Sequence, residues 1–182
     1  MLFYIFRHGQ TDGNLIKIVQ GSGVDIPLNQ TGEEQAEALG EIFSLLKFPV
    51  IYSSKMLRAR QTAQIVASAC KATVVPVDGL EEVHFGEAEH MLLDDAHAKF
   101  ADILAIIHDL NNPLCFDTKI PGGETVNDSL NRSLNALHKI KESSSETRVA
   151  VATHGALMYN LYLHFFGLPR QFSNCEYFVV DL

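Results

Sequence analysis

LFYIFRHG, residues 2–9, opens the chain and predicts a buried strand that ends in a cation and a histidine. Its five apolar residues are followed at once by Arg7, so the run is too short for a signal-peptide core or a membrane span. A second apolar run, RVAVAT at residues 148–153, ends beside His154 in the same way. Short apolar runs of this kind are typical of central strands that are covered on both faces.

Further strands and helices alternate with these two runs. Similar apolar runs at 49–52 and 73–77 predict two more strands, and a last strand is expected at 176–180. Strand and helix in alternation predict an α/β fold, a three-layer α/β/α sandwich around a mostly parallel sheet.

Helical patterns fill the intervals between the strands. Residues 31–46 carry Thr31 and Glu34 in capping-box spacing, and Ser54 is expected to cap a second helix that runs to about residue 70. An apolar stripe with helical spacing runs from residue 126 to residue 140. The last helix follows Gly155 and is expected to end at Gly167, because glycine is the commonest residue just after a helix.

Length, charge and cysteine content limit the class of protein. At 182 residues with 47% hydrophobic side chains, the chain suffices for one domain with a full core. The net charge of -8 offers no basic stripe, so nucleic acid is not an expected partner, and no membrane segment is expected. The three widely spaced cysteines, Cys70, Cys115 and Cys175, predict neither disulfides nor a zinc knuckle and favour a cytoplasmic protein. Nothing in the sequence indicates the oligomeric state.

Chemically active side chains follow the ends of four predicted strands. Arg7 and His8 follow the first, and His154 follows the run at 148–153. Arg58 lies in the first turn after the second strand, and Glu82 follows the third. Because ligands of open α/β sheets bind outside the carboxyl ends of the strands, we expect these five side chains to share one crevice.

Such a set of side chains suits phosphoryl transfer. Guanidinium groups match phosphate oxygens, and the helix N-termini after Ser54 and Gly155 favour anions. One neutral histidine could attack phosphorus while the other stabilises charge, and a carboxylic acid could protonate the leaving alcohol. The scheme needs no metal and no cofactor, and the other histidines show no ligand spacing such as H-x-x-x-H.

Six blocks of sequence, in order, resemble the histidine phosphatase superfamily, which has the phosphoglycerate-mutase-like fold. The blocks cover nearly the whole chain: RHGQT at 7–11 with Asn14, DIPL at 25–28 with the following TG and QA pairs, SS at 53–54 through RA and QTA, LEEVHFG at 80–86, PGGE at 121–124, and THG at 153–155.

The resemblance implies a role for each matched residue. His8 would be the phosphorylated nucleophile and Glu82 the proton donor, while Arg7, Arg58 and His154 would form the phosphate pocket. Hydrogen bonds to the phosphoryl group, or lining of its pocket, are implied for four further residues: Asn14, Gln20, Gly21 and Gly155.

The chain departs from the family pattern beside the leaving-group pocket. Residues 88–90 read AEH where the family often has Trp-Glu-Gly, so the wall of that pocket differs. Four apolar residues lie on either side of residues 88–90: Phe85, Met91, Leu92 and Leu93. They either form an apolar wall for a leaving group or start a helix packed on the core.

Three functions fit the residues. The first is hydrolysis of a small phosphate monoester. The second is a phosphomutase, but mutases of the family resemble longer chains with segments that close over the pocket, and only a small cap-like insertion at about 82–123 is expected here within the single domain 1–182. The third is a non-catalytic binder of phosphorylated ligands, which would normally lose the nucleophile or the acid. The compact length resembles α-ribazole phosphate phosphatases, while sugar phosphates, nucleotides and phosphoserine stay open as substrates.

Overall fold

The computed structural model describes all 182 residues and contains one five-stranded sheet in the order β3-β2-β4-β1-β5. Its strands are β1 (Leu2–Arg7), β2 (Val50–Ser53), β3 (Thr73–Pro76), β4 (Arg148–Thr153) and β5 (Tyr177–Asp181). The pairs among β1 to β4 are parallel, and β5 runs antiparallel to β1 at the edge. The predicted strands at 49–52, 73–77 and 176–180 are each present, with every end within one residue of the prediction.

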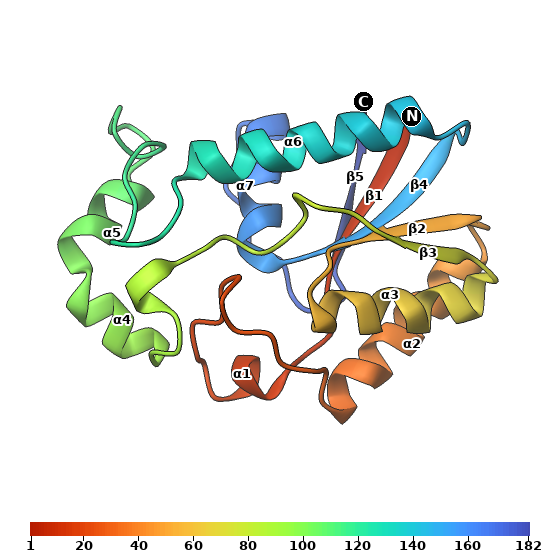
Figure 1. The fold of residues 1–182 in the computed structure, drawn as a ribbon, viewed down its shortest axis with the longest axis horizontal. Helices are drawn as coiled ribbons and strands as arrows, with labels where there is room; N and C mark the ends of the chain where they lie inside the picture. Colours follow the sequence, from red (N-terminus) through yellow and green to blue (C-terminus); the bar gives the residue numbers. More distant parts are fainter.

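Helices cover both faces of this sheet, which confirms the predicted three-layer sandwich (Figure 1). Helices α2 (Gln30–Ser44) and α3 (Leu57–Cys70) lie on one face, and α6 (Val126–Ser143) and α7 (Gly155–Phe166) lie on the other. Because successive side chains of a strand point to opposite faces, Ile5 joins the core under α6 and α7, while Phe6 joins the core under α2 and α3. β1 is therefore buried on both faces, as its sequence predicts.

The start of α2 differs from the prediction. Asn29, not Thr31, caps this helix, and its side chain accepts a hydrogen bond from the Gly32 backbone N–H at 3.0 Å. Asn29 also donates its backbone N–H to the Gln10 carbonyl, so the loop after β1 holds it in the extended conformation that a cap needs. Thr31 thus lies within the first turn.

The start of α3 also differs from the prediction, because Ser54 does not cap it. The helix begins at Leu57 after Met56, and no side chain of the adjacent sequence caps it. Instead Asp25 accepts a hydrogen bond from the Leu57 N–H at 2.8 Å. A carboxylate from a distant loop therefore takes the place of the expected serine, whose hydroxyl instead accepts the Met56 N–H at 3.3 Å just before the helix.

Helix α6 begins, and helix α7 ends, where the sequence predicts. Thr125 caps α6 in a capping box with Asp128, and the six buried side chains of α6 include the apolar stripe at Leu130, Leu137 and Ile140. Gly167 follows α7 with a left-handed φ of 70°. A glycine adopts this conformation without strain, which explains why α7 stops there.

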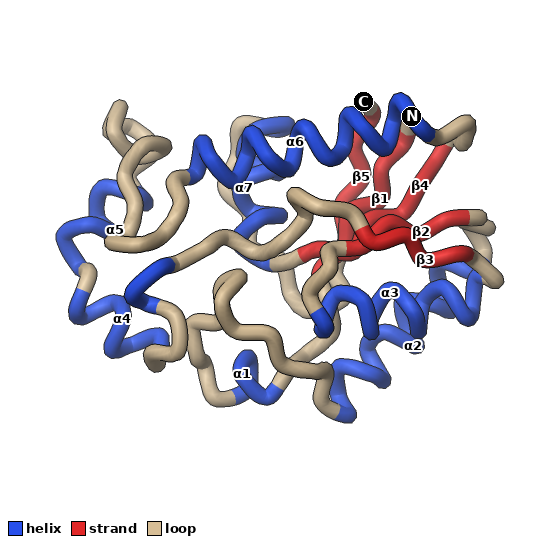
Figure 2. The backbone as a smooth tube through the Cα atoms, viewed as in Figure 1, coloured by secondary structure: helices blue, strands red, loops and turns tan.

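Residues 82–123, which we call the cap, lie to the left of the sheet in Figure 2. The cap contains a 3-10 turn (Gly86–Ala88) and the short helices α4 (Leu93–Lys99) and α5 (Ala101–His108). It is tied to the loop after α1 (Asp12–Leu15), where the Leu93 N–H donates to the Lys17 carbonyl at 2.8 Å. No helix of the chain is both long and apolar enough to cross a membrane.

Candidate active site

His8 is buried directly after β1, and both ring nitrogens have a partner. Nδ1 lies 2.7 Å from the Gly9 carbonyl oxygen, and Nε2 lies 3.2 Å from Nε of Arg58. A carbonyl can only accept and a guanidinium can only donate, so Nδ1 carries the proton and Nε2 carries the lone pair. The nucleophilic nitrogen of this neutral imidazole is therefore Nε2.

The surroundings of His8 keep the imidazole neutral. Burial lowers the pKa of His8 well below its usual range, and the nearby charges of Arg58 and Arg7 lower it further, against a smaller opposing effect of the Gly9 carbonyl. A neutral imidazole retains its lone pair at physiological pH. This is the protonation state that nucleophilic attack requires.

Arg58 is buried and its guanidinium is held by backbone carbonyls. Nη1 donates to the Val24 carbonyl at 2.7 Å, and Nη2 donates to the Gly21 carbonyl at 2.9 Å. Burial lowers the pKa of Arg58 from its high ordinary value, and the negative charge of Glu82 opposes this change. Gly21, predicted to line the phosphate pocket, thus contributes a carbonyl that orients Arg58.

His154 and Arg7 contain the only two buried side-chain nitrogen or oxygen atoms without a hydrogen-bond partner. His154 uses Nε2 to contact Oγ of Ser54 at 2.9 Å, and its Nδ1 has no partner. Arg7 donates from Nη1 to the Phe172 carbonyl at 2.7 Å, and its Nε has no partner. An unsatisfied buried polar atom costs about 1–3 kcal/mol, so two of them in one crevice indicate a place for a polar ligand.

The two residues that contain these unpartnered atoms are neighbours of His8: Arg7 precedes it in the chain, and the ring of His154 lies beside its ring. The rings of His8 and His154 are 5.2 Å apart between centroids. Gly155, which follows His154 in the chain, packs against Arg7. A Cβ at position 155 would lie only 3.1 Å from Arg7 Nε. The absence of a side chain at Gly155 therefore leaves the space beside the guanidinium open at the N-terminus of α7.

Glu82 lies at the same helix N-terminus. Its carboxylate accepts backbone N–H groups from Val83 at 2.9 Å, Ala156 at 3.1 Å and Leu157 at 3.0 Å. The helix dipole and these donors stabilise a negative charge at this place. The structure thus brings Glu82, Arg7, Arg58, His8 and His154 into one crevice.

Asn14 and Gln20 contact Thr11, three residues after His8. The side chain of Asn14 accepts the Thr11 N–H at 3.1 Å, and Gln20 Oε1 accepts the Thr11 hydroxyl at 3.1 Å. Asn174, which the sequence did not indicate, donates from Nδ2 to the His8 carbonyl at 2.9 Å and to Asn14 at 3.3 Å. These amides brace the loop that carries His8.

Arg132 is a second residue that the sequence did not indicate. From α6 it donates to the carbonyls of Gly79 at 3.0 Å, Glu81 at 2.8 Å and Glu82 at 3.0 Å. The same guanidinium binds the carboxylate of Glu124 at 2.6 and 3.0 Å. Arg132 therefore fixes the backbone from which the Glu82 carboxylate extends. The only sequence signal was Glu124, the glutamate of the PGGE block.

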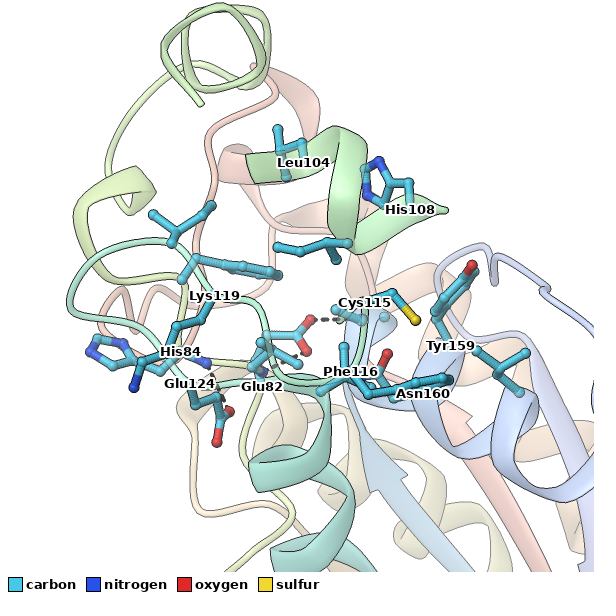
Figure 3. Close-up of a pocket in the computed structure, with 18 of the residues that line it drawn as sticks. Glu82, His84, Leu104, His108, Cys115, Phe116, Lys119, Glu124, Tyr159 and Asn160 are labelled. Atoms are coloured by element: carbon cyan, nitrogen blue, oxygen red, sulfur yellow. Dashed lines mark hydrogen bonds between the residues drawn. The ribbon is translucent and has the colours of Figure 1, made fainter. Parts of the chain in front are cut away.

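A cavity of about 600 Å³, which we call the cap pocket, opens beside this crevice (Figure 3). Its floor includes Arg7, Glu82 and Gly155, and its far walls come from α5 and α7. Phe85 and Leu93 line it, as one reading of the sequence predicts. Two other residues of that group take different places: Met91 packs in the small core of the cap and Leu92 is exposed.

The AEH departure at 88–90 lies behind the pocket wall. Ala88 is buried in the core of the cap. Glu89 contacts His84 Nδ1 at 2.9 Å and accepts the Phe85 N–H at 3.0 Å, while it packs against Gly21. Glu89, the one residue of this segment that matches Trp-Glu-Gly, therefore shapes the loop beside Arg58, while the departures themselves are Ala88 and His90. No group of three or more His, Cys, Asp or Glu side chains has a metal-binding arrangement.

This molecule is an α/β protein with a crevice at the carboxyl ends of its parallel strands. The crevice contains two histidines and two arginines, a set of side chains that suits a phosphate group. A family model described as the histidine phosphatase superfamily, branch 1, matches residues 3–180. The chain belongs to this superfamily.

Relatives with different named activities are similar to the chain. The uncharacterised phosphatase PhoE of Bacillus subtilis strain 168 is 31% identical over 157 residues, which are 86% of this chain and 73% of the relative. GpmB of Serratia proteamaculans, a probable phosphoglycerate mutase, is 29% identical over 184 aligned positions, 98% of this chain and 83% of the relative. A mycobacterial glucosyl-3-phosphoglycerate phosphatase solved with VO3 superposes with a TM-score of 0.87 at 25% identity, covering 99% of this chain and 92% of its own. The chain is thus an enzyme of the histidine phosphatase family.

Proposed function

We propose that this chain hydrolyses small phosphate monoesters through a phosphohistidine on His8, with Glu82 as the proton donor and without a metal. One observation carries the proposal: the buried Arg7 Nε and His154 Nδ1 lack partners, and both belong to neighbours of His8, whose imidazole has its lone pair on Nε2. Phosphoryl oxygens placed between them would accept the missing hydrogen bonds. The phosphorus would then lie beside the nucleophile.

In the first step, Nε2 of His8 attacks phosphorus and the bond to the leaving oxygen breaks. The proton on Nδ1 stays in place, because Nδ1 donates it to the Gly9 carbonyl oxygen, which lies 2.7 Å away. This hydrogen bond also stabilises the charge of the phosphorylated ring. The Arg58 Nε–H stops donating to His8 and donates a hydrogen bond to a phosphoryl oxygen instead. Arg7, Arg58 and His154 would then stabilise the charge that builds on the equatorial oxygens.

Glu82 is proposed to manage the proton of the leaving group. Its carboxyl group lines the cap pocket together with Arg7, so it lies where the leaving oxygen of a phosphate bound at Arg7 would be. The protonated carboxyl can donate to the leaving alkoxide as the bond breaks. The resulting carboxylate, held by three backbone N–H groups, can accept a proton from the water that attacks the phosphohistidine. Release of inorganic phosphate restores His8.

The test is release of inorganic phosphate from p-nitrophenyl phosphate in excess chelator. We expect activity in the parent and a loss of at least about a thousandfold in His8→Ala, because the nucleophile is absent. His138→Ala is the matched control, since His138 is exposed on α6 and does not line the cap pocket. Activity that vanishes with chelator contradicts the metal-free mechanism, and activity that survives in His8→Ala contradicts the nucleophile.

The same preparation separates the alternative functions. A phosphomutase shares the phosphohistidine but returns the phosphoryl group to the substrate, so it would interconvert phosphoglycerate isomers with little phosphate release. A non-catalytic binder would hold inorganic phosphate and show neither reaction. The presence of both the nucleophile and the acid favours catalysis.

A further inference from the structure

Helix α5 is unusually apolar for its place in the fold. Four of its eight residues are large aliphatic ones: Ile103, Leu104, Ile106 and Ile107. None of its residues is fully buried. A helix with so many aliphatic side chains normally buries them against a partner, so the partner of α5 is incomplete in the free protein.

Two of these aliphatic residues face the cap pocket. Leu104 and Ile107 are three residues apart, on one side of the helix, and both line the cavity. Phe116 and Leu163 lie among the lining residues contributed by other segments, and 14 of the 24 lining residues are hydrophobic. The empty space against α5 therefore favours an apolar occupant (Figure 3).

Few polar groups of the pocket are available to hydroxyl groups of a ligand. Asn160 donates its amide to the Ser129 hydroxyl at 3.0 Å, and His84 Nδ1 contacts Glu89. Glu124 is paired with Arg132 at 2.6 Å. His108 and Lys119 are exposed, so they lie at the mouth of the pocket. Tyr159 and Gln171 also line the pocket and could meet a hydroxyl, but a sugar placed against Leu104 and Ile107 would find no polar partner there.

The polar groups at the floor and the apolar walls together describe one kind of ligand. We propose that the leaving group of the substrate is a bulky, largely apolar alcohol, aryl or alkyl, which packs against Leu104 and Ile107 while its phosphate lies at Arg7. This inference rests on the proposed phosphatase function of the same site. A cavity of about 600 Å³ has room for such a group. Phosphoserine, phosphoglycerate and sugar phosphates would leave the apolar wall uncovered.

Alkylphosphonates provide a test that does not need turnover. Binding of methyl-, butyl- and hexylphosphonate to the parent protein is measured by calorimetry at constant pH and salt. We expect Kd to fall about threefold to fourfold for each added methylene, the value for full burial of a CH2 group. Equal affinities along the series would overturn the inference. Phosphate release from the corresponding alkyl phosphates, whose leaving alcohols have nearly constant pKa, should follow the same order in kcat/KM.

A pair of variants on one helix locates the effect. Ile107→Ser should weaken hexylphosphonate by about tenfold and leave methylphosphonate unchanged, because it removes apolar wall and keeps the phosphate contacts. Ile106→Ser is the matched control, since Ile106 has similar partial exposure but does not line the pocket. Normal methylphosphonate binding shows that each variant is folded. Equal effects of the two variants on hexylphosphonate would contradict the assigned wall.

Failure of this inference can be told from failure of the proposed function. A protein that releases phosphate from p-nitrophenyl phosphate but binds all chain lengths equally would retain the phosphatase function and refute the apolar leaving group. A protein that binds longer phosphonates more tightly but releases no phosphate would retain the apolar pocket and refute the phosphatase.

Discussion

Nε of Arg58 lies 3.2 Å from Nε2 of His8 and donates to the one ring nitrogen that has a lone pair. The other two nitrogens of the same guanidinium hold the carbonyls of Gly21 and Val24. Arg58 therefore links the loop at residues 21–24 to the imidazole. In the proposed reaction only the Nε–H has to change partner, because the two loop contacts can stay in place.

Arg58→Lys tests this arrangement. A lysine has one nitrogen and lacks the planar fork, so it cannot contact Gly21, Val24 and the reacting group together. We expect kcat/KM for p-nitrophenyl phosphate to fall by about 10²–10³, as on loss of one donor to a developing anion. Arg60→Lys is the control, since Arg60 is exposed two residues further along α3. If both variants kept parental kcat/KM, the role of Arg58 in phosphoryl transfer would be wrong.

Ser54→Ala tests the contact that orients His154. The Ser54 hydroxyl lies 2.9 Å from His154 Nε2, and its loss leaves both nitrogens of a buried ring without partners. The ring can then turn away from the phosphoryl group, so kcat should fall by about tenfold or more. Ser53→Ala is the control, because Ser53 is equally buried but bonds only the adjacent Ser54 carbonyl at 2.8 Å. Equal losses of kcat in both variants would point to a packing effect.

The central part of the fold could be predicted because its signals are local. The apolar run before Arg7 and the similar run before His154 each determine a strand and place a candidate site residue at its end. Parallel neighbours then bring these ends together without any further information. The same reasoning holds for Gly167, whose left-handed φ of 70° ends α7 in the structure as in the prediction.

The parts that could not be predicted depend on contacts between distant segments. Ser54 has the sequence pattern of a helix cap, but Asp25 takes that role from 32 residues away. Arg132 on α6 looks like any charged residue on a helix surface until the backbone near Glu82 is placed against it. Asn174 precedes the last strand and contacts His8 only because β5 pairs with β1. Such contacts carry no periodic signal in a single sequence.

The two buried histidines should make folding stability depend on pH. Burial is the main reason that the pKa of His8 and the pKa of His154 lie well below the usual range. The unfolded chain therefore takes up protons first as the pH falls through about 6.5, while the folded protein stays neutral at these sites. Stability is thus fully present above this pH and is lost as the pH falls below it.

Urea denaturation at pH 8, 7, 6 and 5 measures this dependence. Each histidine contributes a slope of up to about 1.4 kcal/mol per pH unit below pH 6.5. His154→Gln should remove one such contribution, because the variant lacks the buried imidazole. Parallel curves for the parent and His154→Gln between pH 7 and 5 would show that His154 does not titrate as described.

Arg132→Gln tests whether placement of Glu82 matters for proton donation. Arg132 does not touch the crevice directly but holds the carbonyls of Glu81 and Glu82 and the carboxylate of Glu124. If the acid is misplaced, kcat/KM should fall most for substrates whose leaving group needs a proton. Nitrophenolate leaves without being protonated, whereas an alkoxide needs a proton to leave. We therefore expect kcat/KM to fall by about 10²-fold for butyl phosphate and by much less for p-nitrophenyl phosphate.

Glu82→Gln supplies the reference pattern for Arg132→Gln, because an amide keeps the shape of the side chain but cannot donate the acidic proton. Both variants should show the same selective loss of kcat/KM on alkyl phosphates. Arg148→Gln, at the exposed start of β4, should show neither change. A purely structural role for Arg132 would instead lower kcat/KM for both substrates equally, and that result would remove Arg132 from the positioning of the acid. The leaving-group dependence separates the two cases because lost folding reduces the concentration of active enzyme, whereas a displaced carboxyl changes only the step that needs its proton.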